Sequence, residues 1–262
     1  MSCIKGFCPS FVSVIGGKVR TAEKRPADFD FSSLPEPQLP THDLPYGIVL
    51  AGVGGTGVTT LGAVLGMAAH IEGKGASVLD MTGLAQKFGA VITHLQIANQ
   101  AEDIHAARIA AGGAKLVIGC DLVVAASNDS MVKVDRNEAA AVINGHEAMT
   151  AEFTRNPDAK FPAKSMHDII KECVGDETTD FVDATRVVED LFGSNMAANT
   201  FLAGFAYQKG LIPISGEAIE EAIRLNGASI DENLMAFDLG RLTAVDPATV
   251  KMIEKETPAP ET

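Results

Sequence analysis

Glycines recur at the end of a short apolar run, and a segment with helical periodicity follows them directly. The apolar run covers residues 48–51, and the glycines are Gly52, Gly54, Gly55 and Gly57. This order predicts a strand, a glycine turn and a helix, which is how α/β proteins point backbone N–H groups at an anion. We therefore expect a ligand at this turn, although a turn that only packs remains the alternative.

Three of these glycines also fit the G-x-G-x-x-G fingerprint of dinucleotide-binding folds. They are Gly52, Gly54 and Gly57, and Asp80 ends the next predicted strand about twenty residues later, where such folds bind a ribose hydroxyl. A P-loop is not expected, because Val58 stands where the phosphate-binding lysine would be. The fingerprint leaves open a module that binds NAD or FAD by itself.

The other residue types that perform chemistry do not form a recognisable set. The six histidines show no metal-ligand spacing with one another or with cysteine. Cys3 and Cys8, the latter followed by proline, are half of an iron–sulfur ligand set, and free thiols are the simpler expectation. Cys120 and Cys173 are interpreted as small buried residues. No nucleophile–base pair is apparent, so we predict a binding domain without catalytic or metal-ligating residues of its own.

The elements that would hold the turn alternate between strands and helices. Predicted strands cover residues 48–51, 76–80, 91–97, 116–118, 122–126 and 181–183, and predicted helices cover 58–71, 187–191, 195–208, 215–226 and a segment opened by a capping box at Ser229. Residues 91–97 alternate as if the strand had two unlike faces, and 122–126 is predicted to be a central strand. The fold class is α/β, with a doubly wound, mainly parallel, Rossmann-like sheet and a helical C-terminal third.

Composition and charge narrow the classes of partner. The chain has 262 residues and is 46% hydrophobic. Its formal net charge of −13 argues against nucleic acid or an anionic membrane surface as a binding partner. No apolar run is long enough to cross a membrane, and the start lacks the pattern of a signal peptide. Four cysteines are too few for a disulfide framework, so we expect the protein to reside in the reducing cytoplasm.

Proline placement predicts the domain boundaries. Five prolines between Pro26 and Pro45 interrupt all periodicity. We expect residues 1–46 to be the end of a preceding domain with a proline-rich linker that wraps a surface or joins two domains. Residues 47–245 would be one α/β domain, and residues 246–262 a flexible tail.

Several passages in fixed order give the chain a family likeness over nearly its whole length. They cover residues 3–12, 52–60, 80–91, 199–211, 222–227 and 237–242. Together they resemble the gamma-type domain of the 2-oxoacid:ferredoxin oxidoreductases, and most of all the C-terminal part of the large fused indolepyruvate:ferredoxin oxidoreductases.

The resemblance implies oxidative decarboxylation of an aryl 2-oxoacid to an acyl-coenzyme A, with electrons passed to ferredoxin. Thiamine diphosphate and [4Fe-4S] clusters would belong to other domains of the full enzyme, since this chain has neither their Gly-Asp-Gly segment nor their Cys-x-x-Cys array. The chain would then be a piece of a longer polypeptide, inactive alone, with the thiamine-diphosphate-binding domains as its partners.

The resemblance also assigns residues. It places Gly52, Gly54, Gly55, Gly57, Thr59 and Thr60 in an anion-facing turn. Gln86 and Lys87 would face the partner domain, where Lys87 would meet a phosphate or carboxylate, and Asn199 would lie at the domain contact. Two alternatives stay open, namely the self-sufficient NAD- or FAD-binding module and an assembly subunit whose glycine turn only packs.

Overall fold

The computed structural model of the chain describes residues 29–42, 45–83, 89–148, 156, 158 and 160–248. They contain a six-stranded sheet with the strand order β2-β3-β1-β4-β5-β6. The strands are β1 (Tyr46–Val53), β2 (Gly75–Thr82), β3 (Ala90–Ala98), β4 (Ala114–Gly119), β5 (Ala140–Asn144) and β6 (Thr179–Val182). Strands β1, β4, β5 and β6 pair in parallel, whereas β3 is antiparallel to both of its neighbours.

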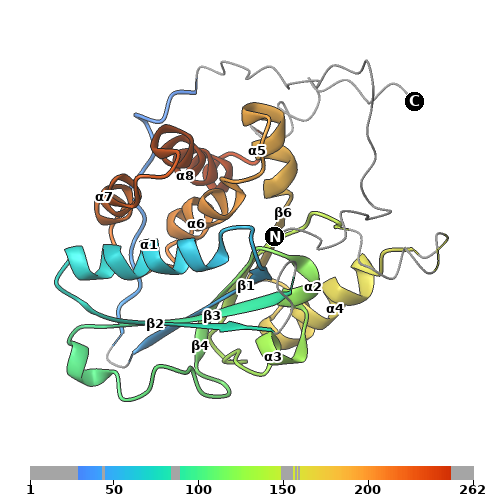
Figure 1. The fold of residues 1–262 in the computed structure, drawn as a ribbon, viewed down its shortest axis with the longest axis horizontal. Helices are drawn as coiled ribbons and strands as arrows, with labels where there is room; N and C mark the ends of the chain where they lie inside the picture. The colour runs from blue at the N-terminus through green and yellow to red at the C-terminus, as the bar shows by residue number, and fades with distance from the viewer. Residues whose placement is uncertain are drawn as a thin grey trace, which may run out of the picture.

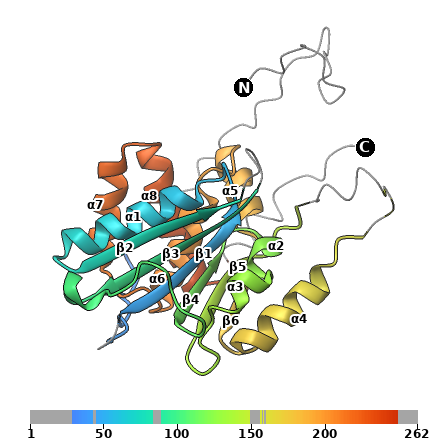
Figure 2. The same ribbon diagram turned by 60° about the horizontal axis from the view of Figure 1, so that its bottom comes forward.

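Helices cover both faces of this sheet. They are α1 (Val58–Ile71), α2 (Leu122–Ala125), α3 (Asn128–Met131), α4 (Ala163–Val174), α5 (Ala184–Phe192), α6 (Ala198–Gln208), α7 (Gly216–Asn226) and α8 (Ile230–Val245), with a 3₁₀ turn η1 (Ala101–Asp103). Figure 1 shows α1, α6, α7 and α8 together over one face, and the turned view in Figure 2 shows α2, α3 and α4 on the other. The predicted α/β class, mainly parallel sheet and helical C-terminal third are confirmed.

Strand β1 is the buried centre of the sheet. Its residues Ile48–Ala51 are fully buried and divide between the two hydrophobic cores on either face. A strand that is covered on both faces needs apolar residues throughout, which explains the unbroken run in the sequence. The strand predicted at residues 91–97 is β3, and its residues Val91–Leu95 are buried on both faces of the sheet.

The predicted central strand at residues 122–126 is wrong. Leu122–Ala125 form the short helix α2, whose N-cap is Asp121, since the Asp121 carboxylate accepts a hydrogen bond from the N–H of Val124 at 2.9 Å. An apolar run of this length fits a buried strand and a buried helical turn equally well, and the capping aspartate is the feature that separates them.

The helical caps near the C-terminus were predicted with mixed success. Ser215 caps α7 by accepting a hydrogen bond from the N–H of Ala218, and Gly227 ends α7 with a positive φ, as expected. Ser229 precedes α8 as predicted, but it makes no side-chain cap, because its backbone is left-handed with φ 42°. The carbonyl of Ser229 instead accepts a hydrogen bond from the Asn233 side-chain amide.

Helices α6 and α8 cross at glycines that bring their backbones into contact. An ideal Cβ at Gly204 would lie 1.9 Å from the Phe237 carbonyl oxygen, and one at Gly240 would lie 2.0 Å from the Phe201 carbonyl oxygen. Both distances are far inside van der Waals contact, so no side chain fits at either position. The small residues in the predicted helix 195–208 therefore serve close helix packing.

The described part of the predicted linker lies against the domain. Phe29 and Leu39 pack on the same core as α6 and α8, and the Gln208 side-chain amide donates to the Pro35 carbonyl. We call residues 29–42 the strap. No helix within the described residues is long and apolar enough to span a bilayer.

We expect Gly204→Ala to lower the free energy of unfolding by about 1–3 kcal/mol, because the added methyl forces the α6 and α8 backbones apart. Thermal or urea unfolding of the purified chain measures the change. The matched control is Ala63→Leu on the exposed side of α1, which should change stability by less than about 0.5 kcal/mol. Equal stability of Gly204→Ala and the wild type would contradict the close crossing.

Candidate functional site

The glycine turn lies at the point where the connections leave the sheet in opposite directions. Strands β1 and β4 are adjacent and parallel, yet α1, which follows β1, joins one core while α2, which follows β4, joins the other. In open α/β sheets, ligands bind outside the carboxyl ends of the strands at such a switch point. The topology therefore places the predicted turn where a ligand site is expected.

Gly52 has a packing role in this turn. An ideal Cβ there would lie 2.6 Å from Cγ2 of Val58 and 2.9 Å from Cβ of Cys120, so the end of β1 touches both α1 and the residue after β4. Burial, with a contribution from the nearby Asp121 carboxylate, raises the pKa of the Cys120 thiol to about 12. Cys120 is consequently a protonated packing residue at neutral pH, as its sequence context predicted.

Gly54 ties the turn to the loop before β3. Its N–H donates to the Gly89 carbonyl at 2.8 Å and is therefore not available to a ligand. The predicted loop residues Gln86 and Lys87 lie outside the described residues, but Gly89 shows that the C-terminal end of this loop borders the glycine turn.

Gly55 and Gly57 give the turn its open face. Both have positive φ, 92° and 91°, a conformation that favours glycine, and nothing lies within 4 Å of a Cβ built on Gly55. Gly57 is the N-cap of α1. The backbone at Gly55 is therefore open to close approach from solvent.

The first turn of α1 adds donors to this open face. No acceptor among the described residues bonds the N–H groups of Val58, Thr59 or Thr60. The side chains of Thr59 and Thr60 are exposed beside them. Together with the positive end of the helix dipole, this arrangement suits a phosphate or another anionic group.

Asn199 of α6 holds the turn from the other side. It is 6% exposed, and its side-chain amide donates to the Thr56 carbonyl at 2.8 Å, so the predicted contact residue is an internal support of the turn. The same amide nitrogen would lie 3.6 Å from a Cβ at Gly57.

A shallow groove of about 150 Å³ begins at Gly57 and continues between α1, α6 and the turn before α8. Its lining combines apolar side chains such as Leu61 and Ile223 with neutral polar ones such as Thr60 and Asn233, and none of the described residues that line it is charged. Such a groove suits an uncharged chain that bears amides or hydroxyls next to an anionic group.

A polar network that the sequence did not reveal lies at the same edge of the sheet. The Asn144 side chain, at the end of β5, donates to the Cys120 carbonyl and to Oγ1 of Thr185, and accepts from the N–H of His146. The His146 imidazole lies 3.2 Å from the Asp183 carboxylate. Recognition of β5 as a strand would have brought these residues to the site, because its carboxyl end lies beside that of β4.

Asp80 does not occupy the position that a dinucleotide fingerprint requires. Strand β3 separates β2 from β1, whereas the fingerprint needs the second strand of the βαβ unit beside the first. The Asp80 carboxylate accepts a hydrogen bond from Oγ1 of Thr93 on β3. The structure therefore removes the basis for a self-sufficient NAD- or FAD-binding module.

The other residues that could ligate a metal or act as nucleophiles form no second site within the described ranges. Cys3 and Cys8 lie outside the described residues. Within the part of the chain that the structure describes, no three histidine, cysteine or acidic side chains come together in a way that could hold a metal ion. A larger cavity of about 460 Å³, lined by Arg136 and Cys173, is formed by residues distinct from those of the groove.

Replacement of Asn199 by alanine should loosen the glycine turn without unfolding the chain. The Thr56 carbonyl loses its donor, and we expect a loss of about 1–2 kcal/mol in the free energy of unfolding. Denaturant titration measures the loss, and hydrogen exchange of residues 54–57 should become faster. Asn195→Ala, at an exposed position just before α6, is the control and should change neither quantity. Unchanged exchange in Asn199→Ala would show that this contact does not hold the turn.

Curated relatives and solved structures share this architecture. The IorB subunits of indolepyruvate oxidoreductase from Thermococcus kodakarensis and Pyrococcus horikoshii are 29% and 28% identical to the chain over 198 residues, which is 74% of this chain and 94% of each relative. Subunit PORC of pyruvate oxidoreductase from Thermotoga maritima matches the fold with a TM-score of 0.55 at 19% identity, over 76% of this chain and 96% of that one.

A second solved structure extends the comparison to a larger chain. The 2-oxoglutarate:ferredoxin oxidoreductase from Magnetococcus marinus, with 2-oxoglutarate, coenzyme A and succinyl-CoA bound, matches with a TM-score of 0.58 at 15% identity, over 78% of this chain and 32% of that one. The family model of pyruvate ferredoxin/flavodoxin oxidoreductase matches residues 47–243, which is most of the predicted central domain. The chain therefore belongs to the pyruvate ferredoxin/flavodoxin oxidoreductase family, whose enzymes are oxidoreductases that act on 2-oxoacids.

Proposed function

We propose that this chain is the gamma-type component of an indolepyruvate-like 2-oxoacid:ferredoxin oxidoreductase, which converts an aryl 2-oxoacid to an acyl-coenzyme A. The proposal is supported by the family match and by the two IorB relatives, of which the alignment covers 94%. The expected partners are the thiamine-diphosphate-binding domains and, through the full enzyme, ferredoxin. We place this assembly in the cytoplasm, in keeping with the few cysteines.

The open face of the glycine turn is the single observation on which the proposed ligand-binding role of the chain depends. Gly55 leaves room for a ligand, the first N–H groups of α1 have no described acceptor, and Thr59 and Thr60 are exposed beside them. We assign these residues to the binding site of coenzyme A. Gly52, Gly54 and Gly57 would shape the turn, and Lys87 would add a positive charge. Thiamine diphosphate and [4Fe-4S] clusters of the partners would supply the carbanion and electron-transfer chemistry when bound.

The groove beside the turn supports the choice of coenzyme A over a simple anion. Coenzyme A combines phosphates with a long uncharged arm that carries amides. The structure offers an anion-compatible turn next to a neutral groove with amide and hydroxyl side chains. The likeness to a solved chain that holds coenzyme A adds support, although that structure is similar to ours in fold alone.

The test is calorimetric titration of the purified chain with coenzyme A and, separately, with NAD and FAD. We expect saturable binding of coenzyme A, weakened about fivefold to tenfold in Thr59→Val, because the hydroxyl contributes one hydrogen bond of about 1 kcal/mol. Thr41→Val is the matched control, since Thr41 is exposed on the strap before the opposite end of β1, and it should bind as the wild type does.

The other outcomes separate the alternatives. Tight binding of NAD or FAD would overturn the assignment, whatever the topology suggests. No binding of any of the three ligands would favour an assembly role in which the turn only packs, and a pull-down with the thiamine-domain subunits would then measure association directly.

A further inference from the structure

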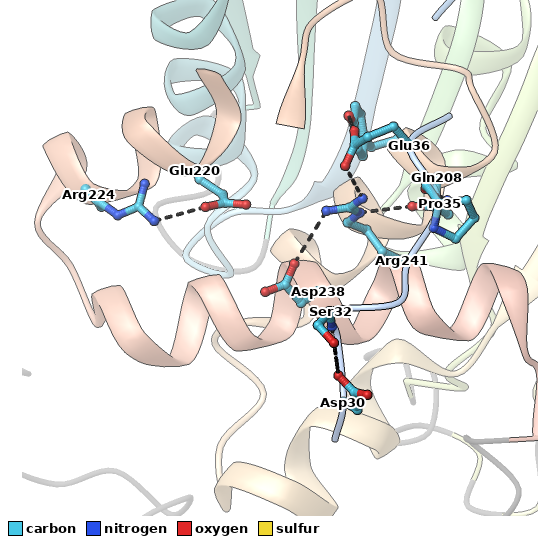
Figure 3. Close-up of polar contacts among 10 residues, drawn as sticks. Asp30, Ser32, Pro35, Glu36, Gln208, Glu220, Arg224, Asp238 and Arg241 are labelled. Carbon is cyan, nitrogen blue, oxygen red and sulfur yellow. Dashed lines mark hydrogen bonds and ion pairs between the residues drawn. The ribbon is translucent and has the colours of Figure 1, made fainter. Parts of the chain in front are cut away.

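The strap places one carboxylate on the face formed by α6 and α8. Oε1 of Glu36 lies 2.8 Å from Nη2 of Arg241, and Oε2 accepts a hydrogen bond of 2.6 Å from the Tyr207 hydroxyl. Figure 3 shows Glu36 beside the guanidinium, with Gln208 next to it and Asp238 on the other side. Both oxygens of the carboxylate are therefore engaged by the domain.

The receiving side chains are built into the domain. The Arg241 side chain is 8% exposed, its Nε donates to Oε1 of Gln208 at 2.9 Å, and its guanidinium lies 5.2 Å from the centre of the Tyr207 ring. A buried guanidinium is costly unless an acceptor compensates it. Without Glu36, the acceptors that remain to Arg241 among the described residues are Gln208 and the Asp238 carboxylate, which is 3.8 Å away.

The strap backbone fits the same face. The Pro35 carbonyl accepts from the Gln208 side-chain amide, and the Gln38 carbonyl lies 2.6 Å from where a Cβ of Gly210 would be. Phe29 and Leu39 pack on the core at either side of Glu36. Prolines within the strap restrict its unfolded conformations and remove N–H groups that would otherwise need acceptors.

The α6–α8 face lies inside the part of the chain that matches the family, and the strap lies outside it. Tyr207, Gln208 and Arg241 lie within the family match at residues 47–243, whereas the strap precedes it. The face therefore lies within the family domain, and the carboxylate comes from the segment that precedes the match.

We propose that the α6–α8 face is a docking surface for an extended, proline-flanked acidic segment, that residues 29–42 of this chain are its occupant, and that the Glu36 carboxylate is its specificity contact. The docked strap fixes where the preceding part of the chain leaves the domain. Residues 29–42 are then a rigid junction and not the free linker that their composition suggests.

Limited chymotrypsin digestion of the full chain tests the docking of the strap, because Phe29 and Phe31 are chymotrypsin sites at its start. The readout is the rate at which products beginning at Asp30 and Ser32 appear in the mass spectrum. At low protease concentration this rate follows the population of the open strap. We expect Glu36→Gln to raise it about fivefold, which corresponds to a modest loss of docking stability.

Two further measurements distinguish the carboxylate contact from apolar packing alone. About 1 M salt, where the screening length is about 3 Å, should speed cleavage of the wild type more than that of Glu36→Gln. Tyr207→Phe, which keeps the ring but removes the donor to Glu36, should also speed cleavage.

The control is Glu177→Gln, which removes a carboxylate at an exposed position near β6 and should leave the rate unchanged. Equal rates for the wild type, Glu36→Gln and Tyr207→Phe, with no effect of salt on any of them, would overturn the proposal. Glu36→Gln conserves size and lies on the strap, outside the family match, so unfolding of the domain does not account for its effect.

Discussion

The end of β1 meets α1 and Cys120 at Gly52, where there is no room for a side chain. Val58 begins α1, which covers one face of the sheet, and Cys120 lies two residues before α2, one of the helices on the other face. The packing of these two side chains against the Gly52 backbone therefore fixes the end of β1 relative to the start of both helical layers. The open turn at Gly55 and the donors of α1 depend on it, because they can face solvent only while the strand end is held in place.

Local sequence patterns were sufficient to predict those parts of the site that are formed by residues adjacent in sequence. The apolar run before Gly52 and the helical spacing after Val58 predicted the strand, the turn and the helix correctly. The family likeness was sufficient to single out Asn199, but its support of the Thr56 carbonyl depends on a contact between residues 143 apart in sequence. Such pairing has no local signal.

The errors came from short apolar segments and from pairing between distant strands. Residues 122–126 fit a strand by composition, yet Asp121 caps a helix there. Strand β5 was not predicted, and with it the Asn144 network at the ligand edge was missed. The fingerprint that includes Asp80 assumes that β2 lies beside β1. In the structure β2 lies beside β3, and the sequence alone could not reveal this strand order.

The strap has a practical consequence for anyone who prepares this domain. Cloning from residue 46, just before the family match begins, would leave the Arg241 guanidinium and the Tyr207 hydroxyl without their carboxylate partner, and would uncover the apolar surface on which Leu39 packs. A recombinant product that begins at Phe29 or earlier would keep this surface covered. The boundary drawn from sequence matching therefore excludes the whole strap, whereas the boundary drawn from the folded surface includes it.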